Sequence, residues 1–304
     1  MQEALKNALL AAIAALFLGC QTLKPPAVGQ ASVNGVSLKY VEQGRGPTVV
    51  MVHGGISDHR VWDLQREAIA RSHRYVSFDQ RYFGTAPWPD DGSKFSFETH
   101  LDDLAAFIRS LNVGAVDLVA WSYGGSLALE LAVRHPDLVK GMFVYEPAGA
   151  FTRRVLTDPD YLKAMAEGAK GLGPAFAATK ANDLVGATRL FAEWVNDQPP
   201  GSYEANAPAW VRTVSGDNAR TITLQMAAKP PTEPVTCAQI GGIKVPVVLA
   251  IGAQTRKTFG MLARAIHACI PGPRLVVVPD ARHSAPYQQP AAFNEAVLEF
   301  LTRK

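Results

Sequence analysis

Residues 115–135 decide the fold, and they read Ala-Val-Asp-Leu-Val-Ala-Trp-Ser-Tyr-Gly-Gly-Ser-Leu-Ala-Leu-Glu-Leu-Ala-Val-Arg-His. The first part, up to Trp121, is a mostly apolar run that predicts a strand buried on both faces. From Gly124 onward the leucines recur at helical spacing, and the helix that they predict ends before Pro136. Ser122 therefore stands where a buried strand turns directly into a helix.

A serine at such a turn is held in a strained backbone conformation, with its hydroxyl exposed at the carboxyl end of the strand. The small residues Ala120, Gly124 and Gly125 let the strand and the helix approach each other closely. The amino terminus of the helix directs free N–H groups toward whatever oxygen Ser122 attacks. The pattern therefore indicates a nucleophilic serine.

Length and composition are those of a globular protein with a full hydrophobic core. The chain has 304 residues, of which 48% are hydrophobic, enough for one large α/β domain or for one domain with an insertion. Its 30 basic and 27 acidic residues leave a net charge of +3, without a dense basic run. This balance gives no reason to expect a nucleic-acid partner.

The first 20 residues differ from the rest of the chain. Lys6 is followed by an apolar run over 8–18, which is too short to span a membrane and is typical of a signal peptide. Phe17-Leu18-Gly19-Cys20 resembles the bacterial lipoprotein box, in which the cysteine is lipidated and becomes the mature amino terminus. An ordinary signal peptide and an uncleaved anchor are the alternatives.

We therefore predict a lipoprotein-type signal peptide over 1–20 and lipidation of Cys20, with 21–30 as a tether that contains Pro25-Pro26. The protein is expected at the periplasmic face of a bacterial membrane, and as a periplasmic or secreted protein if Cys20 is not lipidated.

Two cysteines remain, Cys237 and Cys269. An oxidising periplasm would permit a disulfide between them, and two buried thiols are the equal alternative. We expect both at the end of the sheet opposite the active site. The sequence has no C-x-x-C pair or His/Cys cluster, so it predicts no metal site.

Other segments extend the α/β pattern on both sides of Ser122. A hairpin is predicted within 31–43, because Asn34-Gly35 is a two-residue turn signal between alternating residues. Further strands are predicted at 48–52, 75–79, 139–145, 245–251 and 275–278, and helices at 96–111 and from Pro290 to the end.

Three motifs now carry a family resemblance. Ala120-Trp121-Ser122-Tyr123-Gly124 resembles the G-x-S-x-G nucleophile elbow of the α/β-hydrolase superfamily, with alanine in place of the first glycine. His53-Gly54-Gly55 follows a strand, as in that family, and His283 lies between the last strand and the last helix. The resemblance covers 31–304 and implies an α/β-hydrolase fold, a mostly parallel twisted sheet flanked by helices.

The resemblance also implies an oxyanion hole and a helical cap. The residue after His-Gly and the residue after the nucleophile supply backbone N–H groups in this family, which assigns these roles to Gly55 and Tyr123. Residues 150–235 lack strand patterns and resemble the family's cap, inserted after the strand that ends at Glu146. The core then consists of 31–149 and 236–304.

Within the cap, helical segments are predicted at 161–170, 184–195 and 203–229. Helix-breaking sequences at 171–174 and 199–201 are expected to separate them. Aromatic residues suggest an apolar substrate pocket that the cap covers: Trp88, Trp194, Trp210 and Tyr287.

The acid of the family's catalytic triad is missing from its usual place. Most relatives carry an aspartate in a G-x-x-D pattern after the strand at 245–251, where this chain has Gly252-Ala253-Gln254-Thr255. Some α/β-hydrolases carry the acid at the end of the strand after the nucleophile helix, and Glu146 occupies that position. Asp280 competes, but it lies only three residues before His283 and is expected to brace its own loop.

Serine is a poor nucleophile at neutral pH and needs a base that a buried carboxylate orients. We therefore predict a triad of Ser122, His283 and Glu146 that cleaves a small to medium, largely apolar carboxylic ester through an acyl-enzyme, without a cofactor. Hydrolysis of a carbon–carbon bond, lactone or amide, or acyl transfer, would use the same triad. Epoxide and haloalkane hydrolysis in this superfamily use an aspartate at the elbow, so Ser122 argues against both reactions. A non-catalytic binding protein on this fold is the alternative of another class.

Overall fold

The computed structural model describes residues 23–148, 157–228 and 235–302. One sheet contains eight strands in the order β1-β2-β4-β3-β5-β6-β7-β8. From β4 to β8 neighbouring strands are parallel, whereas β2 is antiparallel to both β1 and β4. The predicted, mostly parallel sheet is therefore confirmed. The strands are β1 (Ala27–Val33), β2 (Val36–Gln43), β3 (Thr48–Val52), β4 (Arg74–Phe78), β5 (Val116–Trp121), β6 (Val139–Tyr145), β7 (Val247–Gly252) and β8 (Arg274–Val278).

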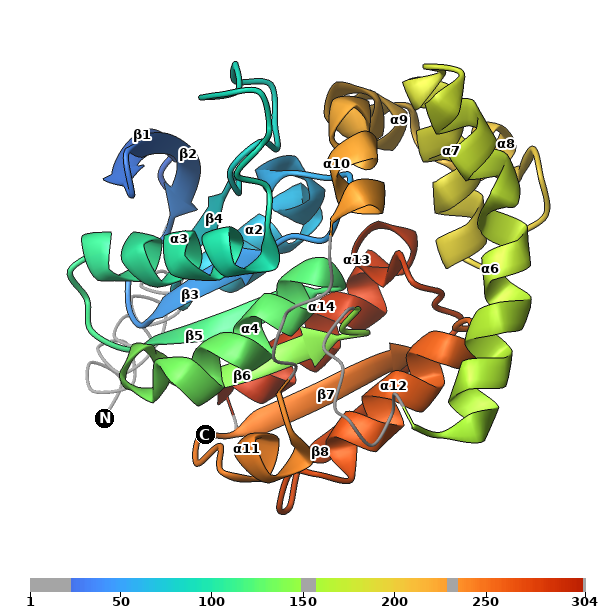
Figure 1. Cartoon of the computed structure of the whole chain (residues 1–304). Helices are drawn as coiled ribbons and strands as arrows, with labels where there is room; N and C mark the ends of the chain where they lie inside the picture. Colours follow the sequence, from blue (N-terminus) through green and yellow to red (C-terminus); the bar gives the residue numbers. More distant parts are fainter. Residues whose placement is uncertain (1–22, 149–156, 229–234, 303–304) are drawn as a thin grey trace, which may run out of the picture.

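Helices cover both faces of this sheet (Figure 1). One face packs against α3 (Phe97–Ser110), α4 (Tyr123–Arg134), α11 (Cys237–Gly241) and α12 (Lys257–His267). The other packs against α2 (Asp63–Ala70), α13 (Ala285–Gln288) and α14 (Pro290–Thr302). Along β5, Leu118 and Ala120 belong to the first core and Val119 and Trp121 to the second. The strand that precedes Ser122 is therefore buried on both faces, as its apolar sequence predicts.

The amino-terminal hairpin begins earlier than predicted. Asn34 and Gly35 form its turn with φ values of 45° and 77°, as this turn sequence predicts. The tether prediction for 21–30 is wrong at its end, because β1 already begins at Ala27 and pairs with β2 over its whole length. Gly29 permits this pairing, since a Cβ there would collide with the ring of Tyr40.

The segment between β6 and β7 is helical where it is described. It contains α6 (Pro159–Lys180), α7 (Leu184–Val195), α8 (Ser202–Asn206), α9 (Ala209–Asn218) and α10 (Ile222–Ala227). These helices gather at one end of the sheet, apart from α3 and α4 (Figure 1). We refer to α6–α10 as the cap. Its proposed boundaries at 150 and 235 stay a prediction.

Two helix predictions within the cap were wrong. The glycines at 171–174 do not break a helix, because α6 continues through Pro174. Gly171 serves packing instead: a Cβ there would lie 2.9 Å from the indole of Trp194, whose Nε1 donates to the carbonyl of Gly168, one turn earlier, at 2.7 Å. The single helix predicted over 203–229 is divided into α8, a second helix from Ala209 and α10, since Pro208 lacks the N–H that a continuing helix needs.

Cys237 and Cys269 form a disulfide with their Cα atoms 5.1 Å apart, which decides the alternative that the sequence left open. Cys237 begins α11 before β7, and Cys269 follows α12 before β8. The disulfide therefore lies near the amino ends of these strands, opposite the end that carries Ser122. Among the described helices, none combines the length and apolar character needed to cross a membrane.

A buried histidine forms a hydrogen bond with Tyr123, the residue that follows Ser122. His100 on α3 is 1% exposed, and its Nε2 donates to the Arg81 carbonyl at 3.2 Å. Its Nδ1 is therefore the acceptor for the Tyr123 hydroxyl at 2.7 Å. Burial lowers the pKa of His100 from 6.5 to about 3, because the charged ring would lose its water.

This histidine should make the fold sensitive to acid. The unfolded chain binds a proton at His100 below about pH 6.5, whereas the folded chain resists it down to about pH 3. The contribution of His100 is therefore fully present above pH 6.5 and is lost as the pH falls, by up to about 1.4 kcal/mol per pH unit. Urea unfolding from pH 7 to pH 4 should show a shallower decline for His100→Gln than for the wild type. Equal slopes would contradict this account.

Candidate active site

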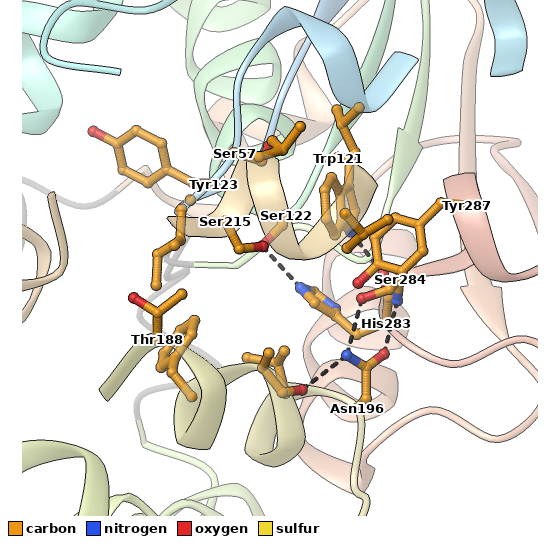
Figure 2. A pocket seen from close by; sticks show the side chains of 18 of the residues that line it. Ser57, Trp121, Ser122, Tyr123, Thr188, Asn196, Ser215, His283, Ser284 and Tyr287 are labelled. Carbon is orange, nitrogen blue, oxygen red and sulfur yellow. Dashed lines mark hydrogen bonds between the residues drawn. The ribbon is translucent and has the colours of Figure 1, made fainter. Parts of the chain in front are cut away.

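Three side chains from distant parts of the chain meet at the carboxyl end of the sheet. His283 Nε2 lies 2.9 Å from Ser122 Oγ, and His283 Nδ1 lies 2.7 Å from Glu146 Oε2. A carboxylate only accepts, so Nδ1 carries the proton and Nε2 accepts from the serine hydroxyl. Figure 2 shows the contact between Ser122 and His283 beside the residues that line the cavity. The structure thus brings together Ser122, His283 and Glu146, which the sequence selected as candidates for nucleophile, base and acid.

Ser122 has the strained backbone expected at a strand-to-helix turn. Its φ of 55° is positive, and its N–H donates to the Tyr145 carbonyl on the neighbouring strand at 3.0 Å. Its carbonyl accepts from the N–H groups of Ser126 and Ala148. Gly124 lies so close to β3 that a Cβ would collide with the carbonyls of Val52 and His53. Backbone contacts on both sides therefore hold the serine in place.

Glu146 follows β6 directly and is 0% exposed. Its Oε1 accepts from the N–H of Gly252 at 2.8 Å, and its own N–H donates to the Ala250 carbonyl at 2.9 Å. Gly252 is the first residue of the run from which the usual aspartate is missing, so that strand end supplies a hydrogen-bond donor in place of an acid. The competing carboxylate, Asp280, is exposed in the turn after β8.

The loop that carries His283 is fixed by contacts that the sequence did not reveal. Trp121 Nε1 donates to the His283 carbonyl at 2.7 Å, and the ring of Phe259 stacks on the imidazole at 4.1 Å. From the cap, Asn196 bonds the next residue twice: its Oδ1 accepts from Ser284 N–H and its Nδ2 lies 2.9 Å from Ser284 Oγ (Figure 2). No pattern around Asn196 indicated this role, because its partner is 88 residues away.

Gly55 and Tyr123, the predicted oxyanion donors, both line the cavity together with Ser122. Gln225 of the cap lies directly over Gly55, because a Cβ at position 55 would collide with the Gln225 side-chain oxygen. A side chain at position 55 would therefore require the end of Gln225 to move. His53 is a structural residue: its Nδ1 donates to the Gly54 carbonyl and its Nε2 accepts from Gln80 N–H.

A cavity of about 190 Å³ opens in front of the serine. Core elements contribute one side, and α7, α9 and, through Gln225, α10 of the cap contribute the other. On α7 the lining residues recur at helical spacing as Thr188, Phe191, Ala192 and Val195. The remaining wall is also mainly apolar, with Ile56, Val61, Trp121, Trp210, Val211, Val214 and Tyr287.

Of the four aromatic residues that suggested an apolar substrate pocket, two line the cavity in front of Ser122. Trp210 and Tyr287 line the cavity. Trp194 does not, because its indole packs on α6 and lies under the guanidinium of Arg256 at 4.6 Å. Trp88 packs against Tyr82 and Arg220 away from the cavity. Cys20 lies outside the described residues.

One group of side chains has the composition of a metal site, but its members already have partners in the protein. Ligand atoms of Asp58, His59 and Asp79 lie within 4.8 Å of one another. Burial alone would raise the pKa of Asp58, but hydrogen bonds from Arg60 and Asn218 lower it below its ordinary value. Since Asn218 belongs to α9, this group joins the cap to the core. The absence of a metal stays a prediction.

Comparisons with known proteins agree with this architecture. The putative 2-succinyl-6-hydroxy-2,4-cyclohexadiene-1-carboxylate synthase of Bacillus subtilis (strain 168) is 25% identical over 87% of this chain and 95% of its own length. The structure of a Bacillus subtilis carboxylesterase matches with a TM-score of 0.68 and 21% identity, over 92% of this chain and 93% of that one. The enol-lactonase of Burkholderia xenovorans LB400 matches with a TM-score of 0.65 and 23% identity, over 90% of this chain and 100% of that one.

The chain also matches the sequence pattern of a whole protein family. A sequence profile described as the alpha/beta hydrolase family covers residues 49–296, which include every strand from β5 to β8, the cap and the residues that meet at Ser122. With this match and the sheet order described above, the chain belongs to the alpha/beta hydrolase family.

Proposed function

We propose that this hydrolase cleaves a carboxylic ester through an acyl-enzyme on Ser122. The observation that carries the proposal is the position of His283, which contacts the serine hydroxyl through one ring nitrogen and the buried Glu146 through the other. A serine with a base at 2.9 Å has the geometry of an activated nucleophile.

The reaction follows from these contacts. Ser122 Oγ attacks the ester carbonyl while His283 Nε2 takes its proton, and Glu146 stabilises the imidazolium that forms. The N–H groups of Gly55 and Tyr123 stabilise the negative oxygen of the tetrahedral intermediate. His283 then returns the proton to the leaving alcohol. Water, activated by the same base, releases the acid from Ser122.

The cavity supports a small, largely apolar substrate. A cavity of about 150 Å³ holds a benzene-sized molecule, so the 190 Å³ here fits a short acyl or alcohol group. The related enol-lactonase fold shows that the same architecture accommodates a cyclic ester in that protein. Lactone, amide or carbon–carbon bond hydrolysis and acyl transfer are the alternatives, because they would use the same three residues.

For localisation we propose export and lipid attachment at Cys20. The apolar run over 8–18 and the lipoprotein-like Phe17-Leu18-Gly19-Cys20 support it. The disulfide between Cys237 and Cys269 also supports export, since such bonds persist in oxidising compartments.

Substitutions should separate the proposed acid from its competitor. A glutamine at position 146 has only one acceptor oxygen, whereas Gly252 N–H and His283 Nδ1–H each need an acceptor. In either orientation of the amide, its NH₂ group would face one of these two donors. With p-nitrophenyl esters of rising chain length, we expect Glu146→Gln to lower kcat about 10⁴-fold. Ser122→Ala should lower it about 10⁶-fold, and Asp280→Asn should be nearly unchanged.

Labelling with a fluorophosphonate probe tests whether Ser122 is activated, independently of the ester used. Wild type and Asp280→Asn should be labelled quickly at Ser122, and Ser122→Ala should not be labelled. Full activity of Glu146→Gln would show that the acid is misassigned. A wild type that neither turns over nor labels would instead favour a non-catalytic binding protein.

The close approach of Gln225 to Gly55 gives a second test. Gly55→Ala should displace the loop and its N–H from the developing oxyanion, lowering kcat by about 10²-fold. Gly55→Ala combined with Gln225→Ala should recover most of this loss, because the truncated side chain leaves space for the added methyl group. If the double variant is as impaired as Gly55→Ala alone, the collision with Gln225 is not the cause.

Lipid attachment can be tested in a bacterial host with the full chain. Wild type should incorporate labelled palmitate and stay with the membrane fraction after a high-salt wash. Cys20→Ser should lose the label and leave that fraction. Unlabelled wild type in the soluble periplasmic fraction would point to an ordinary signal peptide.

A further inference from the structure

The cavity wall is thin where α9 forms it. On the other side of this wall is an open hollow of about 340 Å³, which we call the outer hollow, lined by Arg60, Asp63, Leu64, Trp210, Thr213 and Val214. Among the described residues, only Trp210 and Val214 line both the outer hollow and the cavity in front of Ser122. They are one helical turn apart on α9, so a single layer of side chains separates the two spaces there.

The core side of this wall is equally thin. Consecutive residues of the short helix η1 (His59–Trp62) face the two spaces, because Val61 lines the cavity and Arg60 lines the outer hollow. Trp210 is the larger of the two side chains that both spaces share. Its ring meets that of Tyr287, another cavity residue, edge to face with 6.1 Å between the ring centroids. Trp210 is therefore the main partition between the cavity and the outer hollow.

The outer hollow suits a hydrocarbon chain. Leu64 is 43% exposed and gives it apolar surface. Its two charged residues already have ion partners, Asp217 at 2.8 Å for Arg60, and Arg66 for Asp63. A hydrocarbon chain in the outer hollow would leave both ion pairs intact and would gain free energy by moving its own surface out of water.

A second hollow beside the cavity is less suitable. It has a volume of about 360 Å³ and shares Asn196 and Tyr287 with the cavity, but its lining includes Arg282 and Gln288. Covering such polar groups with a hydrocarbon chain would remove their water without replacing its hydrogen bonds, which is unfavourable. The apolar space into which the cavity could extend therefore lies behind Trp210.

We propose that Trp210 sets the longest substrate chain that the enzyme accepts, by closing the cavity against the outer hollow. This inference rests on the proposed ester hydrolysis and adds a specificity-determining residue to it. A chain that exceeds the 190 Å³ in front of Ser122 collides with the indole, whereas removal of the indole joins this space to the 340 Å³ behind it. The helix itself stays in place without the indole, because Asn218 at its other end donates to Asp58 of the core at 2.7 Å.

Two series of esters test the length limit. Methyl esters from butanoate to octanoate lengthen the acyl chain, and acetates from ethyl to octyl lengthen the alcohol. In at least one series, kcat/KM of the wild type should fall beyond a certain chain length. Trp210→Ala should remove this fall, because each methylene newly buried in the outer hollow raises kcat/KM up to about fourfold, and two raise it about 15-fold.

Refilling the outer hollow from the core side is the control. Leu64→Trp alone should keep the wild-type length profile, because Trp210 already excludes the chain from the outer hollow. Combined with Trp210→Ala, it should restore the length limit. Phe191→Ala also removes an aromatic ring from the cavity wall, but Phe191 does not line the outer hollow. Adding Leu64→Trp to Phe191→Ala should therefore change nothing.

The two proposals fail in different ways. The role of Trp210 is overturned, while ester hydrolysis stands, if the wild type shows no length limit in either series, if Trp210→Ala keeps the wild-type profile, or if its gain survives Leu64→Trp. If Trp210→Ala does not fold, Val214→Ala opens the same wall by a smaller amount and must shift the limit in the same direction. If the wild type hydrolyses no ester and a fluorophosphonate does not label Ser122, the proposed function is overturned, and the inference about Trp210 falls with it.

Discussion

The site depends on one buried carboxylate. Glu146 is 0% exposed, and a charge in such a place is stable only if hydrogen bonds replace its water. Its two oxygens have different partners, Gly252 N–H and His283 Nδ1. Because Gly252 ends β7 and the histidine follows β8, the carboxylate joins the ends of three neighbouring strands. The requirement to satisfy Glu146 therefore fixes the position of the base, and through the base the orientation of the serine hydroxyl.

The loop around His283 is held from the core and from the cap at once. Tyr145 OH donates to the Arg282 carbonyl and Trp121 Nε1 donates to the His283 carbonyl, so β5 and β6 fix its backbone. The cap contributes through Asn196, whose amide bonds Ser284 without touching the histidine. Arg282, next to His283, also donates to the carbonyls of Asn196 and Asp197 at the end of α7. A shift of α7 would therefore reach the loop of His283 through both contacts, which ties the wall of the cavity to the geometry of the proposed reaction.

Local patterns predicted the sheet and the elbow, and contacts distant in sequence account for what was missed. The apolar strand before Ser122 and the turn at Asn34-Gly35 contain their own signals, and both lie as predicted. Glu146 was selected because the order of parallel strands brings their ends together, although the roles of the three residues stay proposals. Trp194 packs against Gly168 and Gly171 of α6 and so gives these glycines a packing role, but it comes from another helix. Asn196 gave no signal for the same reason.

The core carries the three residues of the proposed reaction, whereas the cap carries much of the cavity wall that a substrate would contact. Ser122, Glu146 and His283 come from strand ends and a loop held by backbone contacts, so few substitutions there would preserve the geometry. The lining face of α7 is a simple helical row, and one side chain in that row can change without moving any strand. The fold and the triad geometry are therefore compatible with several acyl-transfer reactions. The identity of the side chains in that row, and not the triad, is therefore what would distinguish one substrate from another.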